Sequence, residues 1–240
     1  MFQLYTTIIY QPLFNLFIFF YTVIPGTDLG VAIIAVTIIL KLVLLPFAHA
    51  SLKSQRALQQ VQPQLDAIKK QFKDDKTKQT QAMMDLYKKE KVNPFSSCLP
   101  LLIQLPFLIA IYQVFQNGIA SQDLALLYPF VSNPGTLNSI AFGFLDLAKA
   151  NIILAVLAAA AQFWQTKMMM QKKPEVQSAG AKDEAMLAGV NKQMMYMMPA
   201  MTLLFGITLP SGLMLFWLGT TLFTVLQQWY FLREKKTAVV

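Results

Sequence analysis

Residues 30–47 read GVAIIAVTIILKLVLLPF, an apolar run that carries one charged side chain, Lys41. Eleven uncharged residues precede this lysine in the run and six follow it. An ionised side chain near the centre of a bilayer costs about 2.5–3.5 kcal/mol on insertion scales, so its surroundings must offset that cost. One solution is snorkelling, because six residues of helix rise about 9 Å and a lysine stem nearly covers that distance. The other solution is a hydrated notch with polar partners inside the protein.

The composition is that of a membrane protein. The 240 residues are 55% hydrophobic and 13% charged, with a mean hydropathy of +0.47, and apolar runs of spanning length recur. The net charge of +8 does not indicate a nucleic-acid partner, because the basic residues lie between apolar runs, where membrane topology explains them. With one cysteine, Cys98, and one histidine, His49, we expect no disulfide framework, no metal site, no cofactor and no histidine-based catalytic triad.

Five segments are predicted to be membrane helices, which together would form an all-α core bundle. They are residues 29–48, 95–117, 150–168, 193–209 and 212–231. Within the N-terminal segment 1–28, residues 8–24 are apolar but rich in aromatic rings and interrupted by Gln11, Pro12 and Asn15. This pattern predicts an amphipathic helix that lies in the membrane interface, where aromatic side chains are favoured. A sixth span is the alternative for this segment.

The basic residues predict the orientation of the chain. Eighteen of the 20 lie in residues 48–94, in residues 166–192 and in the tail 232–240. The intervening segment 118–149 contains only Lys149. Because an excess of lysine and arginine marks the cytoplasmic side, we expect a multi-pass protein with its N-terminus outside and its C-terminus in the cytoplasm.

Residues 49–94 are predicted to form a basic helical hairpin in the cytoplasm. A polar turn at residues 73–76 separates its second helix, residues 77–91, from a first helix with an apolar stripe. The stripe consists of Leu58, Val61, Leu65, Ile68 and Phe72. Because five aligned apolar side chains need a cover, the pattern favours a docking role over an exposed solubilising arm.

The predicted spans contain more polar side chains than membrane anchors need. These are Thr37, Gln104, Gln113, Gln162, Gln165, Trp217, Thr220, Thr221 and Thr224. Hydrogen bonds between helices explain any one of them. Together with Lys41, which lies one turn after Thr37 on the same helical face, they indicate a hydrated concavity. Ala155 and Ala158–Ala161 permit close approach of helix backbones, and the short fourth span would favour local thinning of the bilayer.

Four ordered stretches resemble the YidC-type membrane protein insertases, relatives of the mitochondrial Oxa and chloroplast Alb insertases. They are residues 31–46 (VAIIAVTIILKLVLLP), 83–106 (MMDLYKKEKVNPFSSCLPLLIQLP), 144–170 (FLDLAKANIILAVLAAAAQFWQTKMMM) and 195–228 (MYMMPAMTLLFGITLPSGLMLFWLGTTLFTVLQQ). The second stretch, which joins the hairpin to the second span, is the most specific of the four. The resemblance extends over nearly everything from about residue 12 onward.

This resemblance implies a non-enzymatic insertase and chaperone of the bacterial cytoplasmic (inner) membrane, in a short form without a large periplasmic domain. The family has a hydrophilic groove that is open to the cytoplasm and to lipid, with an arginine at the position of Lys41. Lysine keeps the positive charge but lacks the planar fork of five donors. Thr37, Gln165 and Trp217 match positions that line the family groove, and Gln104 belongs to the signature.

The implied partners are nascent membrane proteins, which the insertase helps to insert and fold, and the lipid bilayer. The Sec translocon, the ribosome and signal recognition particle components are candidate partners of the cytoplasmic hairpin, and no small-molecule substrate is expected. The alternative function is a small ion-coupled transporter with Lys41 as its titrating group. Against it, the sequence has no inverted repeat and no paired carboxylates within the spans.

Overall fold

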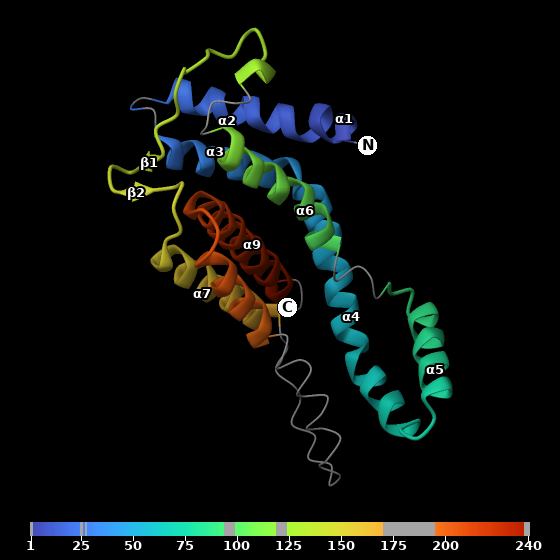
Figure 1. The fold of residues 1–240 in the computed structure, drawn as a ribbon. Helices are drawn as coiled ribbons and strands as arrows, with labels where there is room; N and C mark the ends of the chain where they lie inside the picture. The colour runs from blue at the N-terminus through green and yellow to red at the C-terminus, as the bar shows by residue number, and fades with distance from the viewer. Residues whose placement is uncertain are drawn as a thin grey trace. The chain divides into compact units, whose positions relative to one another are not determined.

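The computed structural model describes residues 2–24, 26, 28–93, 99–118, 124–169 and 195–237. Most of these residues are helical, so the chain has the all-α character that the sequence predicts (Figure 1). The described residues divide into two compact units. The first unit draws on residues 1–43, 104–170 and 192–240, and the second contains residues 44–103.

The first unit begins with a continuous helical segment at the N-terminus. Helix α1 (Phe2–Tyr5), a π-helical turn (Thr6–Tyr10) and α2 (Gln11–Val23) follow one another without a break. Helix α2 packs against α3, and besides Asn15 its buried residues are Leu13, Phe14, Phe17, Ile18 and Tyr21, spaced by one, three or four residues. This spacing is that of a helix with one face in a core.

Length and hydropathy single out one described helix, Gln3–Val23, as long and apolar enough to cross a membrane. Counting α3 and α4 as one broken span would give a second candidate. Three further apolar helices are shorter, namely Leu102–Gln116, Ile152–Met168 and Met195–Gly206. Gln3–Val23 contains the segment predicted to lie in the interface. Its length suits the alternative of a sixth span equally well, so its position stays a prediction.

Helix α3 (Leu29–Val43) contains Lys41 in its last turn and ends earlier than the predicted span 29–48. A new helix, α4 (Leu45–Gln71), starts after Leu44 and has Pro46 in its first turn. The break has a local cause, because proline has no N–H and its ring collides with the carbonyl four residues earlier. The apolar run 30–47 therefore extends beyond the end of α3 into the first turn of α4.

The remaining apolar helices overlap the predicted segments, and the number and bounds of the membrane spans stay predictions. Helix α6 (Leu99–Gln113) continues into a π-helical turn, Val114–Gly118. Helix α7 (Ile152–Met169) and helix α9 (Ser211–Thr237) lie side by side (Figure 1). Met195–Gly206 forms the helix between them in sequence. The predicted starts at residues 95–98 and 193–194 lie outside the described residues.

Small residues bring two of these helices close together, as the sequence predicts for Ala155. A Cβ added to Gly206 would stand 2.5 Å from the Cβ of Ala155 and 2.9 Å from its Cα. Ala155 and Ala158 are fully buried. The backbones of α7 and helix Met195–Gly206 therefore meet with almost no side chain between them.

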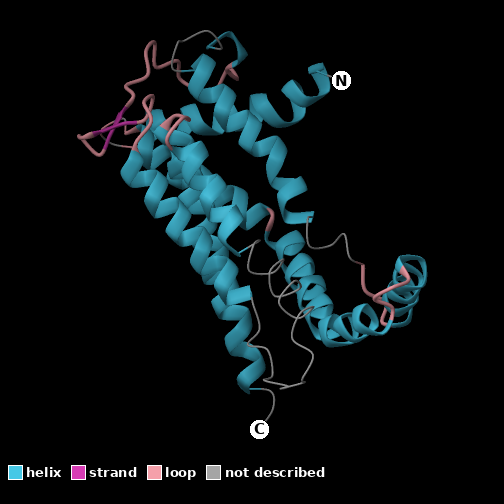
Figure 2. Ribbon diagram, turned by 60° about the horizontal axis from the view of Figure 1, so that its bottom comes forward, coloured by secondary structure: helices cyan, strands magenta, loops and turns pink. Residues whose placement is uncertain are grey.

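A two-stranded hairpin, which the sequence pattern does not predict, lies in the segment between α6 and α7. Strands β1 (Ile140–Ala141) and β2 (Leu145–Asp146) pair antiparallel, with Ile140 opposite Asp146. Phe142 and Gly143 both have positive φ, at 53° and 78°, which allows the tight connection. Figure 2 shows the strands at one end of the helices of this unit.

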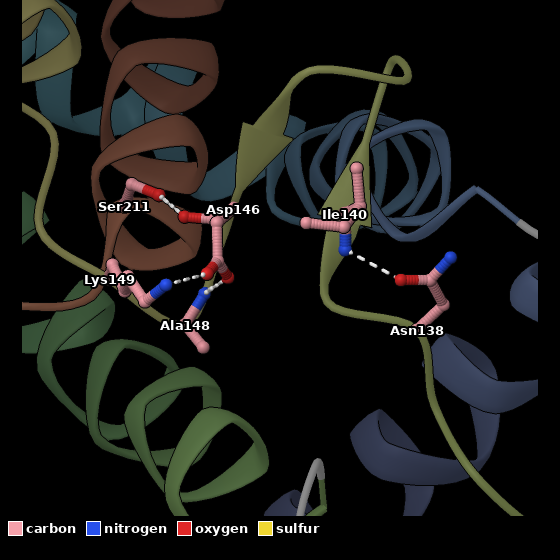
Figure 3. Close-up of polar contacts among 6 residues, drawn as sticks. All are labelled: Asn138, Ile140, Asp146, Ala148, Lys149 and Ser211. Carbon is pink, nitrogen blue, oxygen red and sulfur yellow. Dashed lines mark hydrogen bonds and ion pairs between the residues drawn. The ribbon is translucent and has the colours of Figure 1, made fainter.

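The hairpin is fastened to the first turn of α9. The Ser211 hydroxyl donates to the carbonyl oxygen of Asp146 over 2.8 Å (Figure 3), and the Ser211 N–H donates to the Lys149 carbonyl over 2.8 Å. The Gly212 N–H donates to the Leu147 carbonyl over 3.0 Å. N–H groups in the first turn of a helix have no partner within it, so these carbonyls supply what α9 lacks.

An acid-dependent loss of stability is expected at this connection. The hydrogen bond from Lys149 holds the pKa of the Asp146 carboxyl below its usual range. A carboxyl with a lowered pKa contributes stability above its ordinary pKa of about 3.9, and that contribution is lost as the pH falls through the lowered value. The thermal unfolding midpoint of Asp146→Asn should therefore fall less than that of the unaltered protein below about pH 4. Asp74→Asn, on the exposed surface of the second unit, serves as the control. Parallel pH profiles for all three proteins would contradict this expectation.

The second unit is a helix pair with its own small core. Helices α4 and α5 (Lys76–Lys89) pack together around four buried apolar residues, Val61, Leu65, Leu86 and Val92. Leu58 and Ile68 are partly buried against this core. Four residues of the apolar stripe, Leu58, Val61, Leu65 and Ile68, therefore lie in or against a core that α5 completes within the chain, and a docking role of the hairpin stays a prediction.

Candidate functional site

The charged side chain of α3 is hydrogen-bonded to α9. Nζ of Lys41, which is half-buried, donates to Oγ1 of Thr224 over 3.1 Å. The Thr224 hydroxyl in turn donates to the carbonyl oxygen of Thr220, one turn earlier in α9, over 2.8 Å. Lys41 thus has a polar partner within the protein, and snorkelling alone does not describe its surroundings.

A second group of polar contacts joins α7 to α9. Nε1 of Trp217 donates to Oε1 of Gln162 over 3.3 Å, and the Thr221 hydroxyl donates weakly to the same oxygen over 3.5 Å. Trp217, Thr221 and Thr224 recur at spacings of four and three, which places them on one face of α9. We call Lys41, Gln162, Trp217, Thr221 and Thr224 the polar seam.

The predicted site residues differ in how they relate to the polar seam. Thr37 is 3% exposed and donates to the carbonyl oxygen of Ile33 over 2.7 Å, within its own helix. A Cβ on Gly219 of α9 would lie 3.3 Å from the Thr37 methyl group, so Thr37 packs closely against α9. Gln104 and Gln165 are half-buried, and no hydrogen bond in the described part of the chain links them to the seam. A role in binding for Thr37, Gln104, Gln165 and Trp217 stays a prediction.

Two glutamines that the sequence analysis did not single out extend the seam along α9. Gln227 and Gln228 follow Thr224 by three and four residues. Both amide atoms of Gln227 and the Oε1 of Gln228 are buried without a hydrogen-bond partner among the described residues. A buried polar group without a partner costs about 1–3 kcal/mol, which favours water or a polar ligand at this position. A Gln-Gln pair one turn after Thr224 in an apolar helix was the signal available in the sequence.

The two glutamines of α7 should separate stability from function. Gln162→Leu removes the acceptor of Trp217 and Thr221, so it should lower the free energy of unfolding by about 0.6–1.7 kcal/mol, the range measured for hydrogen bonds between membrane helices. Gln165→Leu, the matched variant one turn along, should leave stability almost unchanged. Denaturation of both variants in detergent micelles checks this. Equal stability of the two variants would mean that the contacts of Gln162 contribute nothing.

The site offers no donor set for a metal ion. Within the part of the chain that the structure describes, no group of three or more histidine, cysteine, aspartate or glutamate side chains could hold one. The groups at the seam are an amine, an indole N–H, an amide and hydroxyls. These groups can bind carboxylates, peptide groups or water.

Comparisons with known proteins place this chain in a family. Residues 19–238 match the model of the 60Kd inner membrane protein family. The YidC membrane protein insertase of Fusobacterium nucleatum is 33% identical over 207 residues, which cover 86% of this chain and 87% of the relative. That of Streptomyces avermitilis is 32% identical over 88% of this chain and 53% of the relative. That of Actinobacillus pleuropneumoniae serotype 3 is 34% identical over 94% of this chain and 37% of the relative.

The apolar helices and the matched family together define an all-α inner membrane protein. The chain belongs to the 60Kd inner membrane protein family, whose relatives named above are YidC-type membrane protein insertases. It spans most of the Fusobacterium relative, about half of the Streptomyces relative and little more than a third of the Actinobacillus relative.

Proposed function

We propose that this chain inserts nascent membrane proteins into the bacterial cytoplasmic membrane and helps them to fold. The observation that carries the proposal is family membership over most of the chain, at about one third identity to relatives named as insertases. The chemistry of the seam suits a binding protein, because its groups hold and orient polar chains and need no cofactor. We propose no enzymatic step.

The polar seam is the proposed contact for the polar end of a client. Lys41 attracts the acidic groups that often lie at the extracytoplasmic end of a membrane protein, and Thr224 positions its amine. Gln165, Thr37 and Gln104 join Trp217 and the other seam residues in the proposed groove, with Gln227 and Gln228 at the far end of the row on α9. Water held by these groups lowers the cost of carrying polar residues part-way across the bilayer.

The energy for insertion would come from the client itself. Its apolar segment partitions from the groove into lipid, which is favourable because apolar surface leaves water. The membrane potential can add to this, at about 2.3 kcal/mol per charge for each 100 mV. The exposed apolar side chains of α7, among them Val156 and Leu157, offer a surface along which such a segment would leave.

The proposed topology has five spans, with the N-terminus outside and the C-terminus in the cytoplasm. The spans are residues 29–48, 95–117, 150–168, 193–209 and 212–231, with an interfacial helix before them. In this arrangement α4 and α5 form the cytoplasmic hairpin, as the ten basic residues between 48 and 94 favour. The hairpin would meet the ribosome, signal recognition particle components or the Sec translocon through its charged surface, since most of its apolar stripe packs against α5.

Site-specific photocrosslinking tests the proposed function. A photoreactive amino acid at Gln165, which is half-buried, should attach to a nascent membrane protein stalled during synthesis. The same probe at Ala158, which is fully buried in α7, is the matched control and should give no client adduct. Adducts at neither position, in a preparation that still inserts the client, would rule out the groove as the path.

A further inference from the structure

The hairpin of β1 and β2 is held rigidly at the end of the first unit where α3, α7 and α9 begin. One Asp28 carboxylate oxygen accepts the N–H groups of Gly30 and Val31, which caps α3, and the other accepts the N–H of Phe142. The Phe142 ring lies against Gly30, where an added Cβ would stand 2.7 Å from ring carbons. Ser211 holds the other strand to α9. The hairpin therefore has a fixed position relative to these helix ends.

The inner side and the tip of this hairpin are apolar. Its inner side consists of Ala141, Leu145 and Leu147, which are 0%, 7% and 0% exposed. Ile140 and Phe142 are each 39% exposed, and Phe144 at the tip is 82% exposed. An antiparallel pair with one face in water ordinarily alternates apolar and polar residues. The strands follow this rule, with Asp146 beside Ile140 on the outer face, whereas the exposed residues of the tip are aromatic, so the tip suits surroundings less polar than water.

The surface next to the hairpin shows what surrounds it. Asn151 caps α7 by accepting the N–H groups of Ile153 and Leu154. Ile152 and Ile153 in the first turn of α7 are 66% and 67% exposed, and apolar exposure continues along α7 at Val156. In an inner membrane protein such a helix surface faces lipid. The hairpin precedes the start of this helix in the chain, and Phe144 is exposed at its tip.

A charged pair lies at the base of the hairpin. Nζ of Lys149 lies 3.0 Å from a carboxylate oxygen of Asp146, and the Lys149 side chain is 82% exposed. A charged pair belongs at the level of headgroups and water, whereas aromatic rings are enriched at the boundary between headgroups and hydrocarbon. The charged pair and the aromatic rings of the tip lie only a few residues apart in the chain, so both belong near the boundary between headgroups and hydrocarbon.

We propose that the tip of the β1–β2 hairpin is a membrane-interface anchor, with the Phe144 ring inserted among the lipid headgroups and the upper acyl chains. Phe142 is held between the tip and α3 and sets the orientation of that ring. The anchor fixes the ends of α3 and α9 at one depth in the bilayer. The occupant of the surface is lipid, because the hairpin is fixed at the ends of apolar helices of an inner membrane protein and α7 exposes apolar side chains from its first turn onward.

Depth measurements on the reconstituted full chain test the anchor. In a Cys98→Ser background, single cysteines replace Phe144, Leu157 on the exposed side of α7, and Gln81 on the exposed side of α5, and each carries an environment-sensitive fluorophore. The vesicles contain lipids with a nitroxide either near the headgroup or deep in the acyl chain. We expect the label at 144 to emit at shorter wavelength than the label at 81, and to be quenched more by the shallow nitroxide than by the deep one.

The labels at residues 157 and 81 are the controls for a deep and an aqueous position. The label at 157 should be quenched more by the deep nitroxide, and the label at 81 only by aqueous iodide. A label at 144 that behaves like the label at 81 overturns the anchor. So does shielding at 144 that disappears when the protein is diluted in lipid, because a second copy of the chain would then be the occupant. An unchanged unfolding midpoint of the 144 variant ensures that the fold is intact.

Discussion

Replacing Lys41 with glutamate should reduce the insertion of clients with acidic extracytoplasmic ends by at least about tenfold. Two unit charges 4 Å apart interact by about 4 kcal/mol at an effective dielectric constant of 20, and each 1.4 kcal/mol corresponds to a factor of ten. Lys41→Glu converts this attraction into repulsion and also removes the donor to Thr224. Insertion into proteoliposomes of purified protein, scored by protection of the client from protease, is the measurement.

Three comparisons isolate the role of the charge. Lys41→Arg should retain activity, because the guanidinium is charged and can also donate to Thr224. Thr224→Val keeps the charge but removes its partner, so it should reduce insertion only in part. A client with a neutral end should be inserted almost equally by Lys41→Glu and by the unaltered protein. Full insertion of acidic clients by Lys41→Glu would remove the groove charge from the mechanism.

Gly206→Val should cause the largest loss of stability among single substitutions at the helix contacts described above. The added side chain would meet Cβ and Cα of Ala155 and the sulfur of Met214, which stands 3.0 Å from the added Cβ. The backbone of Ala155 cannot move aside as the end of a flexible side chain can. Overpacking of this kind typically lowers the free energy of unfolding by about 1–3 kcal/mol. For a chain of this size this corresponds to a fall of about 2–12 °C in the thermal unfolding midpoint, measured in detergent micelles.

Matched variants separate overpacking from a general effect of valine in a helix. Ala160→Val adds the same side chain to the exposed side of α7 and should change the midpoint little. Ala155→Gly should partly rescue Gly206→Ala, because it removes the Cβ at 2.5 Å and leaves the Cα at 2.9 Å. Additive effects of the two substitutions would mean that residues 155 and 206 are not in direct contact.

Much of the fold could be predicted from local patterns. Apolar runs located the helices of the first unit, because an apolar segment of this length forms a helix wherever its backbone groups must pair internally. The stop at Val43 was missed, since Pro46 ends the helix within a run that hydropathy reads as continuous. The strands Ile140–Ala141 and Leu145–Asp146 were missed because two-residue strands carry no periodicity.

The candidate site was predictable in its residue types but less so in its contacts. Lys41 was evident from its position in an apolar run. The sequence does not distinguish Gln162 from the other glutamines of the predicted spans. Only the packing of α7 on α9 joins it to Trp217. Gln227 and Gln228 became candidates for the site only because the structure buries their amide atoms without a hydrogen-bond partner among the described residues. The apolar stripe of α4 illustrates the converse, because the sequence shows that it needs a cover and the structure supplies α5.

The sequence alone determined that this is a helical membrane protein of the insertase family with a lysine among apolar residues. Hydropathy, charge placement and local turns are properties of neighbouring residues, so they can be determined without knowledge of the fold. Only the tertiary structure decided that Lys41 meets Thr224, that Gly206 meets Ala155, and that the hairpin is fastened to Asp28 and Ser211. These contacts join residues far apart in the chain. The sequence offers several partners of similar chemistry for each side chain, and only the packing of the helices selects one of them.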